Sequence, residues 1–292
     1  MEQVVKVIAP AKINLGLSVL GKRDDEYHEI RTLFQAVSLC DEMELRPAPK
    51  GIELVCEGEN VPHDQENIVW KAARLFLSRL DSVQGVRIFL RKNIPVAAGL
   101  GGGSSDAAAV LKGLSSLFSF PLPHQDLLEM GKQLGADVSF FLFGNSALGE
   151  GVGATLTATP PLPNSWIVIV NPGFPISTKW VYTHASLLLT KKSDHINMVK
   201  LFLGENDLPR IGYYLHNDLE AVVVKKYPII NELKNRLLSA GAVGAVMSGS
   251  GASVFGIFAD RPLADQALNV FEREGNGWKI FLTEPLSNTR IN

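Results

Sequence analysis

The stretch from Pro95 to Asp106 constrains this chain more than any other part of the sequence. It reads PVAAGLGGGSSD and runs directly into the alanine-rich segment AAAVL. Three consecutive glycines leave the backbone free to turn several N–H groups toward one anion. A helix predicted from Ser104 to about Leu117 would add its own free N–H groups and the positive end of its dipole. Ser104 and Ser105 add hydroxyl donors, so we predict that this loop binds a triphosphate.

Two other nucleotide motifs fit this loop poorly. A Walker A loop requires a lysine after its last glycine, and none follows Gly103. A dinucleotide-binding fingerprint needs a preceding βαβ start and a glycine spacing that the run from Gly99 to Gly103 does not match. A plain flexible turn before a helix is a further alternative, but three consecutive glycines cost backbone entropy that such a turn does not require.

The rest of the chain mixes strand and helix patterns without a regular βαβ repeat. Strand patterns lie at residues 4–8, 13–19, 30–39, 42–46, 52–56, 86–90, 147–157, 166–170, 243–247, 253–258 and 278–282. Helical patterns lie at 67–77, 104–117, 125–134, 179–188, 217–226, 229–239 and 262–274, with a further helix starting near 137. This mixture predicts an α+β fold with two lobes. Because prolines crowd residues 159–164, we expect the domains to span 1–160 and 161–292.

The composition excludes several classes of protein. The chain has 292 residues, a net charge of −2, 46% hydrophobic and 20% charged residues, which is ordinary for a globular protein. Neither a nucleic-acid partner nor a membrane partner is expected, because the net charge is slightly negative and no apolar run approaches ~20 residues. A local basic pocket for phosphates stays open. No signal peptide opens the chain, so we expect a cytoplasmic protein. Cys40 and Cys56 lack metal-binding spacing and are expected to be reduced; no protein metal site is predicted.

Two further segments carry polar residues where a ligand could reach them. In APAKINLGL, which begins at Ala9, strand alternation places Lys12 and Asn14 on one polar face. That face could line a cleft or simply meet solvent. In GAVMSGSGASVF, from Gly244 to Phe255, a glycine turn separates two strands. Such a turn lets the backbone approach a ligand closely, or it forms a tight hairpin, and the sequence leaves both open.

Together the three segments resemble the GHMP kinases in order and spacing. The chain is most similar to the branch of that family that phosphorylates a cytidine-diphosphate-linked methylerythritol in the non-mevalonate isoprenoid (terpenoid) pathway. The closer likeness is carried by Tyr27-His28, Thr32-Leu33-Phe34-Gln35, Glu66-Asn67-Ile68 and Gly135-Ala136-Asp137-Val138. One departure is Glu26, because this branch usually has glycine before the Tyr-His pair. The stretch 186–212 matches no motif.

The resemblance implies an N-terminal ribosomal-protein-S5-like domain and a ferredoxin-like C-terminal domain, with the site between them. It implies transfer of the γ-phosphoryl group of ATP to a hydroxyl of the erythritol, with Mg²⁺ carried on the ATP. Asp137 matches the catalytic carboxylate and Lys12 the catalytic lysine. Lys12 would keep Asp137 ionised and polarise the hydroxyl, while Asp137 would accept its proton. A helix N-cap before Val138 is the alternative for Asp137, and one residue could serve both roles.

The same resemblance assigns the binding residues. On the nucleotide side they are Asn67, Lys92, Gly99, Gly101, Gly102, Gly103, Ser104 and Ser105. On the substrate side they are Asn14, Tyr27, His28, Thr178 and Tyr182. The cytosine would stack between Tyr27 and Tyr182, with His28 bonded to its edge. A plain helix cap for Asn67 and a solvated surface position for Lys92 are the alternatives.

Two other functions stay open at this point. One is another GHMP kinase, acting on homoserine, mevalonate or a sugar, and the pair Tyr27-His28 argues against it. The other is a non-catalytic nucleotide-binding module on the same fold, against which Lys12, Asp137 and the complete glycine loop argue. The partner is expected to be a small molecule, and the chain to act as a monomer or a homodimer.

Overall fold

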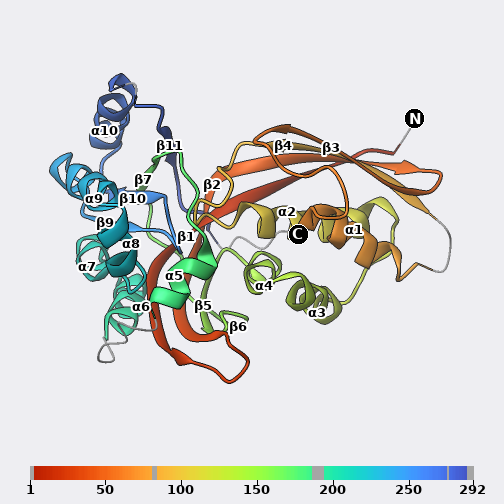
Figure 1. Ribbon diagram of the computed structural model, residues 1–292, viewed down its shortest axis with the longest axis horizontal. Helices are drawn as coiled ribbons and strands as arrows, with labels where there is room; N and C mark the ends of the chain where they lie inside the picture. Colours follow the sequence, from red (N-terminus) through yellow and green to blue (C-terminus); the bar gives the residue numbers. More distant parts are fainter. Residues whose placement is uncertain (1–2, 81–83, 186–193, 275, 288–292) are drawn as a thin grey trace. The chain divides into compact units, whose positions relative to one another are not determined.

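The structure is a computed structural model that describes residues 3–80, 84–185, 194–274 and 276–287, and they form two compact units (Figure 1). Unit 1 consists of Met1–Ala11, Cys40–Val96 and Gly101–Phe143, and unit 2 of Lys12–Leu39, Ala97–Leu100 and Gly144–Asn292. The units interleave along the chain because strands β1 (Val5–Lys22) and β2 (His28–Ala48) contribute residues to both. The two compact units therefore do not coincide with the expected domains 1–160 and 161–292. That boundary stays a prediction about the two family domains.

Unit 1 packs helices on a sheet. Strand β3 (Gly51–Gly58) runs parallel to β4 (Gly85–Lys92), and β4 is antiparallel to β2. The alternation in β4 buries Val86, Ile88 and Leu90 on one face and leaves the residues between them exposed. The helices lie on one side of β3 and β4 (Figure 1); they are α1 (Ile68–Leu77), α2 (Gly102–Leu117), α3 (His124–Leu134) and α4 (Ala136–Phe143).

Local signals place the ends of these helices. Asn67 caps α1, since its side-chain oxygen accepts a hydrogen bond from the backbone N–H of Val69 at 2.9 Å. Gly135 follows the last residue of α3, as predicted. Helix α2 begins at Gly102, two residues before the expected Ser104, so its first turn includes the last two glycines of the run.

Unit 2 is built around a four-stranded antiparallel sheet with the order β11–β7–β10–β9. Its strands are β7 (Trp166–Asn171), β9 (Gly244–Met247), β10 (Val254–Phe258) and β11 (Lys279–Thr283), and the helices α9 (Ile229–Ser239) and α10 (Arg261–Arg273) pack on it. Strand β8 (His216–Asn217) runs parallel to β1, and β5 (Ser146–Gly151) pairs with β2 and with β6 (Thr155–Ala158). The remaining helices are α5 (Thr178–Ala185), α6 (His195–Glu205), α7 (Leu208–Tyr214) and α8 (Glu220–Lys226).

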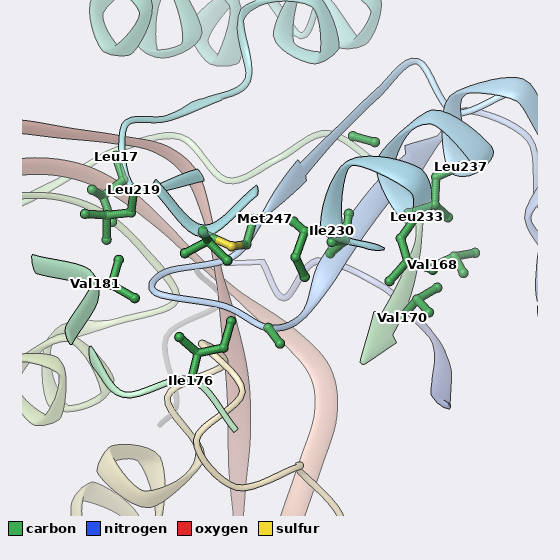
Figure 2. Packing of buried hydrophobic residues seen from close by; sticks show 14 of the residues in the cluster. Leu17, Val168, Val170, Ile176, Val181, Leu219, Ile230, Leu233, Leu237 and Met247 are labelled. Carbon is green, nitrogen blue, oxygen red and sulfur yellow. The ribbon is translucent and has the colours of Figure 1, made fainter. Parts of the chain in front are cut away.

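The core of unit 2 brings together apolar side chains from segments far apart in sequence (Figure 2). Strand β7 supplies Val168 and Val170, and α9 supplies Ile230, Leu233 and Leu237. Their spacing of three and four residues puts the α9 side chains on one face of the helix. Each fully buried side chain of this size contributes about 1.5–3 kcal/mol. This core fixes the frame that carries the glycine turn between β9 and β10.

The α+β prediction is confirmed, with local corrections. Two pairs of predicted strands are single strands, β1 and β2, and the helix predicted from Asn217 begins at Glu220 because Asn217 pairs in β8. Helix α6 and most of helix α7 lie in the stretch 186–212, which matched no motif. Residues 186–188 of the expected helix 179–188 lie outside the described residues. Cys40 and Cys56 are free thiols, as expected. None of the helices in the described ranges has the length and apolar character needed to cross a membrane.

Candidate functional site

The ammonium group of Lys12 lies where three separate segments of unit 2 meet. Its Nζ donates to Asn14 Oδ1 at 2.6 Å and to the carbonyl oxygen of Gly99 at 3.0 Å. Ser248 Oγ donates to the same Gly99 carbonyl at 2.9 Å, and a Cβ at Gly249 would lie 3.2 Å from Nζ. Lys12 is only 4% exposed, so the solvated-face alternative is wrong. The start of the chain, the glycine loop and the C-terminal glycine turn therefore converge on one cation.

A buried hydrogen-bond chain fixes the side chain of Asn14. Its Nδ2 donates to Thr32 Oγ1 at 2.7 Å, and Thr32 Oγ1 donates to the carbonyl oxygen of Gly16 at 2.8 Å. With its amide nitrogen committed to Thr32, Asn14 can only present its oxygen to Lys12. Thr32 was quoted in the sequence as part of a family motif, but no role was predicted for it. The structure gives it a role in orienting the partner of the candidate catalytic lysine.

Gly99 occupies a position that only glycine fits. Its φ of 78° lies in the left-handed region, and an added Cβ would lie 2.0 Å from the backbone oxygen of Ser248. Neighbouring backbone bonds hold the same loop residues: Lys12 N donates to Leu100 O at 2.9 Å and Ser253 N donates to Ala98 O at 3.2 Å. The absence of a side chain at Gly99 allows this close approach of loop and turn.

The side chain of Asn217 holds the C-terminal glycine turn in place through two hydrogen bonds. Asn217 Nδ2 donates to the carbonyl oxygens of Met247 at 2.7 Å and Gly249 at 2.8 Å. The hydroxyls of Thr178 and Ser250 lie 2.9 Å apart, which puts the predicted substrate residue Thr178 beside this turn. Since β9 and β10 pair as antiparallel strands, the hairpin is confirmed. A close approach of this turn to a ligand stays a prediction.

The residues expected to bind cytosine gather at the start of β2 and in α5. The rings of His28 and Tyr182 lie 5.2 Å apart at 36°. Burial, with a smaller effect of Lys22, lowers the pKa of His28 below its ordinary value, so the ring is neutral at pH 7. Within the described residues, His28 Nε2 is buried and has no hydrogen-bond partner. Tyr27 is 66% exposed, and Glu26 has a φ of 67°, which lies in the left-handed region that favours glycine.

The second half of the glycine loop, in unit 1, opens helix α2. Gly101 is its left-handed N-cap, and the first N–H groups of a helix have no partner inside the helix. An added Cβ at Gly102 would lie 3.0 Å from Ile94 Cγ2 and 3.1 Å from Lys92 Nζ. Ser105 Oγ is buried without a partner among the residues that the structure describes. Free backbone donors and an unused hydroxyl fit the predicted anion.

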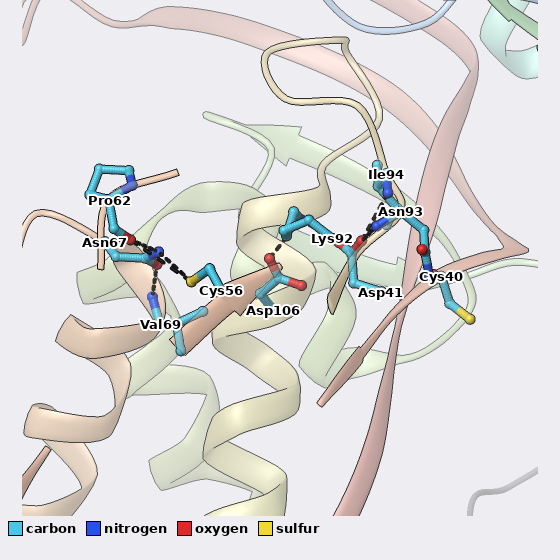
Figure 3. A network of polar contacts seen from close by, with 10 residues as sticks. All are labelled: Cys40, Asp41, Cys56, Pro62, Asn67, Val69, Lys92, Asn93, Ile94 and Asp106. Atoms are coloured by element: carbon cyan, nitrogen blue, oxygen red, sulfur yellow. Dashed lines mark hydrogen bonds and ion pairs between the residues drawn. The ribbon is translucent and has the colours of Figure 1, made fainter. Parts of the chain in front are cut away.

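Lys92 lies inside unit 1 and pairs with two carboxylates (Figure 3). Its Nζ contacts Asp41 Oδ2 and lies 2.7 Å from Asp106 Oδ2. Asp41 Oδ1 also accepts the backbone N–H groups of Asn93 at 2.6 Å and Ile94 at 2.8 Å. The solvated-surface alternative for Lys92 is therefore wrong. The reason is the alternation of β4, whose buried face ends on this residue.

Burial and charge act in opposite directions in this cluster. Burial alone would lower the pKa of Lys92, but the carboxylates of Asp106 and Asp41 raise it above its ordinary value. Burial raises the pKa of Asp106 to about 7, opposed by Lys92 and assisted by the like charge of Asp41. Asp106 Oδ1 is buried and has no partner among the described residues. The carboxyl group of Asp106 is therefore a buried group whose pKa lies close to neutral pH.

The other predicted residues have defined local positions. Asn67 uses its oxygen to cap α1 and its Nδ2 to bond Pro62 O at 2.7 Å, so the cap is confirmed and a nucleotide contact stays a prediction. Asp137 stands in the first turn of α4, where a negative charge is favourable. Because Asp137 belongs to unit 1 and Lys12 to unit 2, their pairing stays a prediction. In the described ranges, no group of three or more His, Cys, Asp or Glu side chains is placed to hold a metal ion.

Comparisons with known proteins cover nearly the whole chain. The GHMP kinases N terminal domain matches residues 67–145 and the GHMP kinases C terminal domain matches residues 198–277. A protein of Syntrophus aciditrophicus named 4-diphosphocytidyl-2-C-methyl-D-erythritol kinase is 46% identical over 278 residues, covering 95% of this chain and 98% of the relative. A protein of Geobacter metallireducens with the same name is 48% identical over 252 residues, covering 86% and 88%.

Solved structures give the same picture. A crystal structure of 4-(cytidine 5′-diphospho)-2C-methyl-D-erythritol kinase has a TM-score of 0.81 and 35% identity, over 96% of this chain and 99% of that one. A homoserine kinase from Cytophaga hutchinsonii has a TM-score of 0.77 and 23% identity, over 99% of this chain and 96% of that one. At that identity, the second likeness shows a shared fold alone.

Proposed function

Because this chain belongs to the GHMP kinases, and within them to the 4-diphosphocytidyl-2-C-methyl-D-erythritol kinases, we propose that it transfers the γ-phosphoryl group of ATP to a hydroxyl of that erythritol. The observation that carries the proposal is the convergence of three sequence segments on the buried ammonium of Lys12. A buried lysine held by an amide and a carbonyl is suited to act on a hydroxyl or phosphoryl oxygen. The reaction is proposed to take place in the cytoplasm, where ATP and Mg²⁺ are abundant.

The glycine loop would hold the phosphates of the nucleotide. The N–H groups at the start of α2, together with the hydroxyls of Ser104 and Ser105, are the donors available there. Mg²⁺ bound with the nucleotide would neutralise charge on the β- and γ-phosphates. Such transfer depends on positioning and charge stabilisation more than on covalent chemistry, so the rigidity of this loop matters for the rate.

The chemical step joins the acceptor oxygen to the γ-phosphorus as the bond from that phosphorus to the β,γ-bridging oxygen breaks, and ADP leaves. The proton of the acceptor hydroxyl goes to the carboxylate of Asp137. Lys12, held by Asn14 and Gly99, would stabilise the charge that develops on the oxygens. In this proposal Asp137 is the proton acceptor and Lys12 is the cation that stabilises the developing charge.

On the substrate side, His28, Tyr27 and Tyr182 would recognise the cytosine. His28 is neutral at pH 7, and its buried Nε2 finds no partner among the described residues, which supports a hydrogen bond to the base. A buried polar atom left without a partner costs about 1–3 kcal/mol, so a base that satisfies it is selected over one that does not. Asn14 and Thr178 would support the rest of this substrate.

Three variants test the chemical step. Asp137→Asn keeps the side-chain shape but removes the proton acceptor, so turnover should fall by about 10²–10⁴-fold while ATP still binds. Lys12→Met should also slow turnover. Because the two residues act as a unit, the double variant should be little worse than the poorer single variant. Turnover and ATP affinity are measured side by side. Near-normal turnover in Asp137→Asn would remove Asp137 from catalysis.

A further inference from the structure

Asp41 lies at the base of the glycine loop without belonging to it. It is a strand residue of β2 and is 0% exposed. Its Oδ1 accepts the backbone N–H groups of Asn93 and Ile94, the two residues directly before Pro95 (Figure 3). An aspartate that accepts two backbone donors at 2.6 and 2.8 Å fixes the path of the chain into the loop.

The second oxygen of the same carboxylate reaches the other end of the loop. Asp41 Oδ2 pairs with Lys92, and Lys92 Nζ also lies 2.7 Å from Asp106 Oδ2. Asp106 belongs to α2, the helix that follows the loop. The ammonium also lies against the first residue of that helix, because a Cβ at Gly102 would come within 3.1 Å of it. One carboxylate therefore ties the entrance of the loop to its exit.

Stability alone does not require three charges here. Two carboxylates and one ammonium leave this buried cluster with a net charge of −1 when Asp106 is ionised. Desolvation of buried ions is costly, and apolar side chains of similar volume often replace such clusters without loss of stability. What an apolar replacement cannot supply is the directed link from the residues before the loop to the helix after it.

We propose that Asp41 is a positioning residue for the nucleotide, which through Lys92 and the backbone of Asn93 and Ile94 holds the glycine loop in the form that binds phosphates. The proposal rests on the proposed function, since it assumes that the nucleotide occupies this loop. The charged and titratable groups that face Asp106 are Lys92 from β4, Asp41 from β2 and the Cys56 thiol from β3.

The test variant is Asp41→Asn, and the chain offers a matched control in the next residue. Glu42 lies on the same strand but is exposed, and it stands 3.9 Å from Arg91, the neighbour of Lys92. Glu42→Gln therefore removes the negative charge from the exposed pair of Glu42 and Arg91 and leaves the contacts of Asp41 with the loop in place. Asparagine at 41 cannot serve both partners, because an oxygen turned to the backbone N–H groups directs its amide donors at the ammonium of Lys92.

The expected result separates ATP from the second substrate. In Asp41→Asn, the Kd and KM for ATP should rise about tenfold, which corresponds to the loss of one charge-assisted hydrogen bond. The KM for the cytidine-linked substrate should stay within about twofold of its value in the unaltered protein. The rise of about tenfold is expected for ATP alone. Glu42→Gln should leave both constants unchanged.

The pH dependence of ATP affinity gives a readout that a merely structural residue would not move. When Asp106 loses its proton, the cluster gains a negative charge beneath an anion site, so ATP affinity should fall as pH rises through about 7. Removing the charge of Asp41 lowers the pKa of Asp106 and should shift this fall to lower pH. Titration of ATP itself is common to all variants. Asp106→Asn, which keeps Asp41, should abolish the fall and serves as the second variant if Asp41→Asn does not fold.

Three results would overturn the inference. One is ATP affinity in Asp41→Asn equal to that of Glu42→Gln; another is equal loss for both substrates; the third is a pH profile unchanged in both Asp41→Asn and Asp106→Asn. If the unaltered protein binds no ATP, the proposed function fails as well. If it binds ATP and phosphorylates its substrate while Asp41→Asn behaves normally, this inference alone fails.

Discussion

Replacing Thr32 by valine tests the hydrogen-bond chain that orients the candidate catalytic lysine. Valine keeps the shape of threonine but lacks the hydroxyl. That hydroxyl accepts from Asn14 Nδ2 at 2.7 Å and donates to the carbonyl oxygen of Gly16 at 2.8 Å. Its loss leaves one buried donor and one buried acceptor unsatisfied, and it frees the Asn14 amide to turn its nitrogen toward Lys12.

The magnitude follows from these two bonds. Each buried polar group left without a partner costs about 1–3 kcal/mol, so the free energy of unfolding should fall by about 2–4 kcal/mol after partial relaxation. Turnover should also fall, since the ammonium of Lys12 loses its 2.6 Å contact to Asn14 Oδ1 whenever the amide turns. A loss of about 1.4 kcal/mol of transition-state stabilisation would lower kcat about tenfold.

Thr32→Ser is the matched control, because serine keeps the hydroxyl and loses only a methyl group, at about 0.8 kcal/mol. Urea unfolding and steady-state kinetics are measured for both variants. Serine should retain turnover close to that of the unaltered protein, and valine should not. If valine at this position keeps both stability and kcat, or if serine is as slow as valine, the chain from Thr32 to Lys12 does not orient the lysine.

Three further predictions concern single positions. Glu26→Gly should raise the free energy of unfolding by up to about 1 kcal/mol, because relief of a left-handed backbone outweighs the flexibility of glycine, and a loss in urea unfolding would contradict this. Gly99→Ala should lower it by at least about 2 kcal/mol, since its Cβ would meet Ser248 O at 2.0 Å; a stable, active alanine variant would disprove that packing. Asp106 has a folded pKa of about 7, above its ordinary value of 3.8, so its contribution to stability is complete below about pH 4 and is lost as pH rises through 7. In Asp106→Asn this part of the pH dependence should disappear when urea unfolding is compared at pH 5 and pH 8.

Features set by neighbouring residues could be predicted from the sequence. The cap at Asn67, the end of α3 at Gly135 and the glycine turn between β9 and β10 each depend on a few adjacent residues. Helix α6 was not predicted, although its apolar residues Ile196, Val199 and Phe202 recur with helical spacing and are buried in the structure.

Features set by distant residues could not be predicted. The alternation Val86, Ile88, Leu90 continues to Lys92 and indicates its burial, but the carboxylates that make this burial tolerable lie 51 and 14 residues away. Asp41 is 51 residues from Lys92 in the sequence, and no local pattern around Asp41 indicates that it pairs with this lysine. Thr32 is likewise tied to Asn14 by a contact that appears only when β1 and β2 are folded.

Incubation of the protein with ATP, Mg²⁺ and 4-diphosphocytidyl-2-C-methyl-D-erythritol tests the central claim most directly. Homoserine, mevalonate and a sugar are offered in parallel as alternative acceptors, and products are detected by mass. The account predicts that the cytidine-linked erythritol gains one phosphoryl group, in an amount equal to the ADP formed, and that the other acceptors stay unmodified. Phosphorylation of another acceptor in preference, or ATP binding with no transfer to any of them, would contradict it.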